Sequence, residues 1–129
     1  MHKIEYKIEW PRKSGVLTPA YMEKVAKHVR RLEFKPTLLT KGFIPQLGAA
    51  DYDVPYCDRT FVVKIDRAQN EEEQVITFIH ELLHIAFYIC GYEGDVEDFV
   101  EEETQKFCKE HPIFAQSLFE QTKKTKSLA

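Results

Sequence analysis

The sequence lacks the features that mark membrane-spanning, disulfide-stabilised and nucleic-acid-binding proteins. No apolar run approaches the roughly 20 residues that a helix needs to span a bilayer. The three cysteines include no CxxC pair, and their odd number argues against a disulfide framework. The net charge of −3 gives no electrostatic reason to bind nucleic acid or an anionic membrane surface.

The first residues do not resemble a signal peptide, because charged and apolar side chains alternate from Lys3 to Trp10. Free thiols favour a reducing compartment, so we expect a cytoplasmic protein. The length of 129 residues fits one domain, residues 1–129. The polar end, residues 123–129, is expected to be a disordered tail.

Hydrophobic periodicity predicts a mixture of helices and strands. From Thr18 onward, apolar residues recur at helical spacing, which predicts a helix of about 15 residues that ends before Pro36. Other segments alternate or are rich in β-branched and aromatic residues, as is typical of strands. The segments expected to form strands are 3–10, 38–39, 48–54 and 59–66.

The second half of the sequence is expected to be helical. Asn70 with Glu73 resembles a capping box and predicts a helix that begins there and runs to Cys90. Further helices are expected at residues 95–110 and 113–122. These elements predict an α+β fold. A short twisted mixed sheet would pack on the N-terminal helix, the helix that begins at Asn70 and the helix after it.

His80-Glu81-Leu82-Leu83-His84 is an HExxH sequence inside this helix. A spacing of four residues places both imidazoles on one face, so both can bind a single metal ion. Glu81 is rotated by about 100° from His80 and can reach a water molecule on the metal, which suits a general base. Apolar residues surround the motif, and burying such polar groups is costly unless they share a purpose.

A catalytic zinc ion normally has three protein ligands and one open position. The metzincin continuation is absent, because Phe87 and Cys90 stand where that pattern has Gly and His. Cys90 near the end of this helix is a conceivable third ligand, and the favoured alternative is an acid on the next helix. The candidate acids there are Glu97, Asp98, Glu101, Glu102 and Glu103. Spacing favours Glu101 over Glu97, and both remain open.

The segment from Glu101 to Cys108 reads EEETQKFC. Over residues 58–112 the chain resembles the HExxH domains of phage and prokaryotic ImmA/IrrE-like peptidases and the single-domain minigluzincins. Their second helix carries roughly ExxANxFA, which this segment matches with Thr, Gln and Cys as replacements. The resemblance implies a gluzincin-type zincin domain with one Zn²⁺ per chain, bound by His80, His84 and Glu101.

These features predict a zinc metallopeptidase, an endopeptidase that hydrolyses a protein or peptide substrate with Glu81 as catalytic base. The substrate is expected to pair with strand 59–66 at the rim of the cleft. Tyr88, Tyr92 and His111 are candidates for stabilising the oxyanion. The alternative is a catalytically weak zinc-bound regulatory or binding module that keeps the fold. The intact base favours the enzyme, and the sequence does not indicate an oligomeric state.

Overall fold

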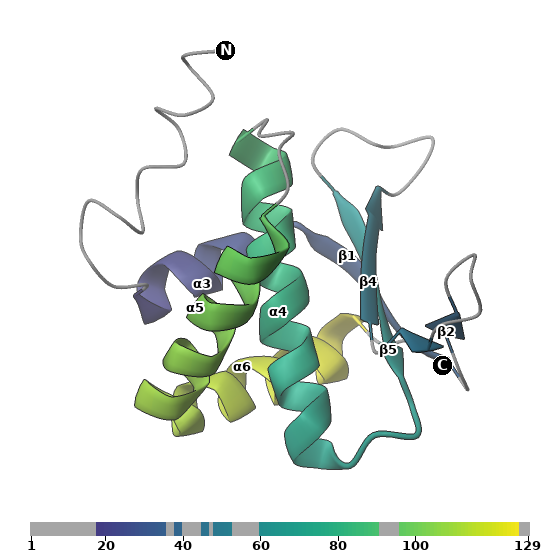
Figure 1. Ribbon diagram of the computed structural model, residues 1–129. Helices are drawn as coiled ribbons and strands as arrows, with labels where there is room; N and C mark the ends of the chain where they lie inside the picture. Colours follow the sequence, from purple (N-terminus) through teal and green to yellow (C-terminus); the bar gives the residue numbers. More distant parts are fainter. Residues whose placement is uncertain are drawn as a thin grey trace.

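A long central helix, α4 (Glu71–Cys90), organises the molecule (Figure 1). A three-stranded sheet lies against one side of α4, and α5 (Glu97–Glu110) packs against the other. Two further helices, α3 (Pro19–Ala26) and α6 (Pro112–Lys126), also contact α4. The fold is a small α+β domain, as predicted. The computed structural model describes residues 18–35, 38–39, 45–46, 48–52, 60–90 and 96–126.

The main sheet has the strand order β1 (Val29–Lys35), β5 (Phe61–Asp66), β4 (Gly48–Tyr52). β1 is parallel to β5, and β4 is antiparallel to it, so the sheet is mixed. Two short strands, β2 (Leu38–Leu39) and β3 (Pro45–Gln46), form a separate antiparallel pair. The predicted strand at residues 3–10 lies outside the described residues.

The place of β5 in the sheet corrects one prediction. Segment 59–66 was expected to form the rim of a cleft, but β5 is the central strand and pairs on both sides. Its near-continuous apolar sequence, FVVKID, is typical of a strand that is covered on both faces. The edges of this sheet are β1 and β4, and within the described part of the chain no strand pairs with the outer side of β4.

The first helix is shorter than the sequence indicated. Its start is as predicted, because the Thr18 hydroxyl accepts a hydrogen bond from the Tyr21 N–H at 3.2 Å. The helix ends at Ala26, however, and residues 29–35 form β1. Parallel pairing with β5, a segment distant in the sequence, outweighs the local helical pattern.

A register shift explains why the sequence of β1 resembled a helix. In a regular strand, residues three apart point to opposite faces of the sheet. Between Val29 and Arg31, β1 contains one extra residue relative to β5, so the alternation is reset there. Val29 and Leu32 are therefore both buried, at 0% and 2% exposed, as a helical pattern would also require.

The start of α4 is determined by a reciprocal capping box, as predicted. Asn70 Oδ1 accepts from the Glu73 N–H at 2.8 Å, and Glu73 Oε1 accepts from the Asn70 N–H at 3.0 Å. From there the helix runs to Cys90, also as predicted. Most of its sides are covered, and these residues are fully buried: Phe78, Ile79, Leu82, Leu83, Ile85 and Ala86.

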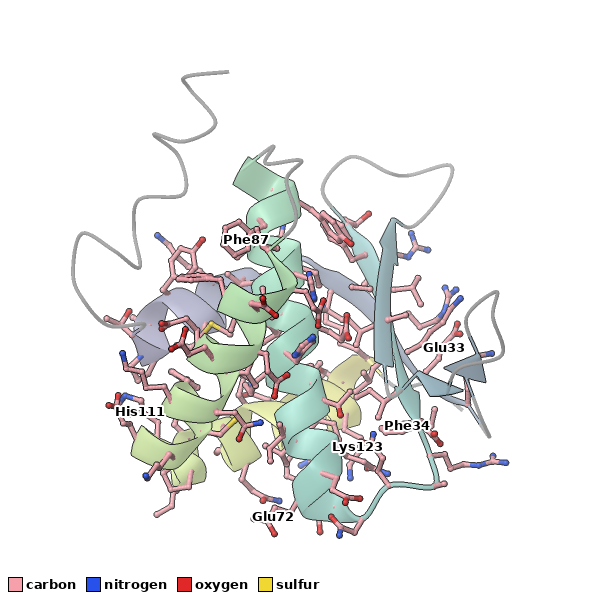
Figure 2. The ribbon with its side chains drawn as sticks, viewed as in Figure 1. Glu33, Phe34, Glu72, Phe87, His111 and Lys123 are labelled. Atoms are coloured by element: carbon pink, nitrogen blue, oxygen red, sulfur yellow. The ribbon has the colours of Figure 1, made fainter. Side chains whose placement is uncertain are left out.

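The last helix, α6, is longer than predicted. It continues to Lys126, so the prediction of a disordered tail is wrong for residues 123–126. The extra turn is supported locally, because the Lys123 ammonium lies 5.0 Å from the centre of the Phe119 ring, which is fully buried (Figure 2). No described helix is both long enough and apolar enough to cross a membrane.

Candidate metal centre

Helix α4 presents His80 and His84 on one face, on the side of α5. Their ring centroids lie 4.9 Å apart, with 58° between the ring planes. The side chains are 17% and 18% exposed, so both rings are accessible from a cleft and yet held by their surroundings. The spacing of the HExxH motif therefore produces the pair of adjacent imidazoles that the sequence predicted.

Glu97, in the first turn of α5, contacts both histidines. Its two carboxylate oxygens lie 3.1 Å from His80 Nε2 and 3.1 Å from His84 Nε2. One ligand atom from each of these three residues lies within 4.8 Å of the others, close enough to hold a metal ion. The donor set is two imidazoles and one carboxylate.

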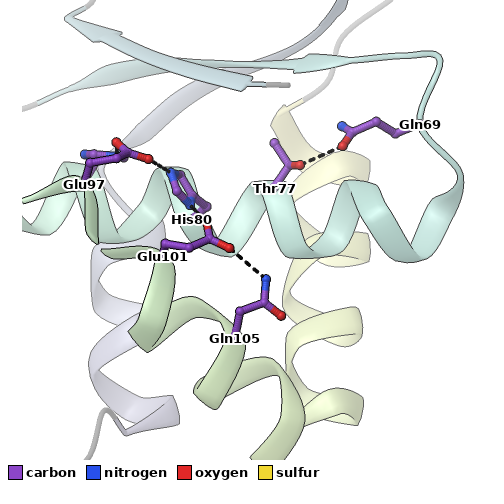
Figure 3. A network of polar contacts seen from close by, with 7 residues as sticks. Gln69, Thr77, His80, Glu97, Glu101 and Gln105 are labelled. Carbon is purple, nitrogen blue, oxygen red and sulfur yellow. Dashed lines mark hydrogen bonds and ion pairs between the residues drawn. The ribbon is translucent and has the colours of Figure 1, made fainter. Parts of the chain in front are cut away.

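Glu101 occupies a different position. One of its oxygens lies 3.3 Å from His80 Nδ1, and the other accepts a hydrogen bond from the Gln105 amide at 3.1 Å (Figure 3). Among the described residues, the group that could hold a metal contains Glu97 and not the predicted Glu101. The third member of this group is thus Glu97, the alternative that the sequence left open.

The two acids differ in their contacts because they lie at different levels along α5. Residues four apart share a helix face, so both Glu97 and Glu101 can point towards α4. They differ by a rise of about 6 Å along the axis, and spacing alone does not show which of them meets both imidazoles. The point at which α5 crosses α4 determines which of the two acids contacts both imidazoles.

The contact with Glu101 also bears on which nitrogen of His80 can bind a metal. A proton on Nδ1, directed at the Glu101 carboxylate, leaves the Nε2 lone pair for the metal. For His84, burial lowers the pKa and the adjacent His80 acts in the same direction, while Glu97 opposes both. A lowered pKa favours the neutral imidazole, which is the form that binds metals.

Glu81 lies beside this group but is not part of it. Its side chain is buried, at 6% exposed, and it lines the same cleft as the histidines. It lies close to the start of β4, because a Cβ placed on Gly48 would be 3.1 Å from Glu81 Oε2. The predicted base thus lies in the cleft that contains the metal-binding group, close to β4.

The cleft has a volume of about 670 Å³ and opens between β4, α4 and α5. Its lining includes Gly48, Ala49, Ala50, Thr77, His80, Glu81, His84, Tyr88, Glu97, Glu101 and Gln105. The contribution of β4 was not predicted, because the rim was expected at the more apolar segment 59–66. The sequence feature that could have indicated this role of β4 was a short run of small residues, Gly-Ala-Ala, within a predicted strand.

The structure distinguishes among the aromatic and histidine side chains considered for oxyanion stabilisation. Tyr88 lines the cleft. His111 follows the last turn of α5 and packs on Phe107, with ring centroids 4.9 Å apart, and it is not among the cleft residues (Figure 2). Tyr92 lies outside the described residues.

Gly48→Ala is expected to lower the free energy of unfolding by about 1–3 kcal/mol. The new methyl carbon would lie 2.5 Å from Thr77 Cγ2, so β4 would have to move away from α4. Chemical denaturation measures the cost. Thr77→Ser is the matched background, because it deletes Cγ2 and keeps the hydroxyl that donates to Gln69 Oε1 at 2.9 Å. An equal cost in both backgrounds would show that Thr77 is not the cause.

The functional feature that the structure shows is a group of two histidines and one glutamate, His80, His84 and Glu97, that could hold one metal ion. The histidines have the spacing of HExxH. The resemblance to gluzincin peptidases rests on this motif and on the α5 segment. No family model matches the chain, and no curated protein or solved structure is significantly similar to it.

Proposed function

We propose that this protein is a zinc-dependent metallopeptidase. The observation that carries the proposal is the group formed by His80, His84 and Glu97, with the buried Glu81 carboxylate beside it. Imidazole ligands favour zinc over magnesium or calcium, which prefer oxygen ligands. Structural zinc sites normally use four protein ligands. The described group would supply three, and in this proposal the fourth position is open to water or substrate, as in catalytic sites.

In this proposal Glu101 orients a ligand instead of binding the metal. Histidines that bind metals usually donate their second ring N–H to a carboxylate, a carbonyl group or water. The 3.3 Å contact between Glu101 and His80 Nδ1 matches that arrangement. The hydrogen bond from Gln105 would in turn hold the Glu101 carboxylate in place.

The chemistry of hydrolysis would be divided between the ion and Glu81. A zinc ion held at this site would polarise the scissile carbonyl and make a water molecule more acidic. The Glu81 carboxylate would accept a proton from that water and pass it to the leaving amine. Its burial against β4 would restrict the carboxylate to the position where this transfer occurs.

A peptide substrate is supported by the edge strand beside the site. Among the described strands β4 lies at an edge of the sheet, and its residues Gly48 to Ala50 line the cleft that contains both histidines. An extended peptide could add to this edge through main-chain hydrogen bonds, which would place its carbonyl groups near the metal. The small side chains on β4 would leave room for such a peptide.

The test is to measure zinc content and the cleavage of a peptide library by the same preparation. We expect about one zinc ion per chain, and cleavage that a chelator abolishes and added zinc restores. Zinc binding without cleavage of any peptide would instead support the binding-module alternative. A protein that binds no zinc would contradict the proposal altogether.

A further inference from the structure

The two histidines of the metal-binding group are held in different ways. His80 has a carboxylate at each ring nitrogen, Glu101 at Nδ1 and Glu97 at Nε2. Within the described ranges, the polar partner of His84 is Glu97 at Nε2, and no polar group contacts Nδ1. An imidazole ring can adopt a wide range of χ2 angles. A histidine ligand with a polar partner at only one ring nitrogen therefore needs another contact to hold its ring in one orientation. For His84 that constraint has to come from packing.

The packing is supplied by a row of rings along α4. His80, His84 and Tyr88 follow one another at intervals of four residues, so they occupy successive turns of one face. The centroids of His84 and Tyr88 are 6.4 Å apart, and their ring planes differ by 29°. The His84 ring therefore lies between the ring of His80 and the ring of Tyr88.

Tyr88 is itself supported by the sheet. Its ring stacks on Phe61 with a centroid distance of 5.6 Å and an interplanar angle of 16°. Phe61 begins β5 and is fully buried, so it is a rigid support. Tyr88 is 39% exposed and lines the cleft, as is common for a side chain that combines an apolar ring with a polar end.

We infer that Tyr88 is a positioning residue for His84, and that its ring does for this ligand what Glu101 does for His80. The inference rests on the proposed metal site. The positioning effect comes from the face of the Tyr88 ring, and the hydroxyl group has no part in it. Through the successive ring contacts of Phe61, Tyr88 and His84, the sheet would thus restrict the orientation of a metal ligand on α4.

Zinc affinity, measured by competition with a chelator, tests the inference. Tyr88→Leu should bind zinc about tenfold more weakly, whereas Tyr88→Phe should bind like the wild type. The matched control is Phe78→Leu, which removes a ring from the same helix where it contacts Phe119. This control should lower stability and leave affinity unchanged. The inference is overturned if Tyr88→Leu retains full affinity or if Tyr88→Phe loses as much as Tyr88→Leu.

A second measurement needs no metal and separates this inference from the proposed function. In NMR spectra of the metal-free protein, the His84 ring protons should be shifted by the ring current of Tyr88. The shift should persist in Tyr88→Phe and disappear in Tyr88→Leu, with His80 little changed. An unaltered His84 signal in Tyr88→Leu would refute the inference. A wild-type protein without zinc affinity would contradict the proposed function, and the His84 signals would still decide the positioning role.

Discussion

Glu97→Ala is expected to abolish stoichiometric zinc binding, whereas Glu101→Ala should weaken it by about 10- to 100-fold. Glu97 is the carboxylate that meets both imidazoles, at 3.1 Å from each Nε2. Of the two histidines Glu101 contacts only His80, through Nδ1, so the loss of Glu101 would free the orientation of one ligand and remove none. Zinc content after dialysis and affinity by chelator competition separate the two effects.

Glu102→Ala is the matched control for both variants. It removes an acid from the same helix, and Glu102 does not line the cleft that contains the histidines. Its zinc content should equal that of the wild type. The reverse order, with zinc lost in Glu101→Ala and kept in Glu97→Ala, would contradict the assignment of Glu97 and support Glu101 as the third ligand.

Glu81→Gln is expected to reduce peptide hydrolysis by about 10²- to 10⁴-fold while the protein keeps its fold and its zinc. Glutamine has nearly the shape of glutamate but cannot accept a proton from water. Glu81 also lies outside the metal-binding group, so its replacement should leave the ligands in place. Initial rates on a cleaved peptide, zinc content and thermal unfolding together measure the three properties.

Glu72→Gln makes the same chemical change at an exposed position on the same helix (Figure 2). It should leave the rate, the zinc content and the unfolding temperature unchanged. Hydrolysis by Glu81→Gln at the rate of this control would exclude Glu81 as the base. A loss of zinc from Glu81→Gln would mean that the carboxylate belongs to the metal site itself.

Helix α4 and its pair of adjacent histidines could be predicted from the sequence because the interactions that define them are local. The capping box joins Asn70 and Glu73, and the two imidazoles are four residues apart. Such spacings specify which side chains share a helix face before any tertiary contact forms. The position of Glu81 beside the histidines follows from the same helical geometry.

Three other features could not be predicted from the sequence, because they depend on contacts between segments that are distant in it. Residues 29–35 form a strand because β5 is available as a parallel partner. The strand at the sheet edge beside the cleft is β4 and not β5, because β5 is paired with β1 on one side and with β4 on the other. Glu97, and not Glu101, meets both imidazoles because of where α5 crosses α4. Local sequence patterns specify where a helix or strand ends and which side chains share a face of it. Only packing specifies which element each face contacts, and at what level along the helix or strand axis that contact occurs.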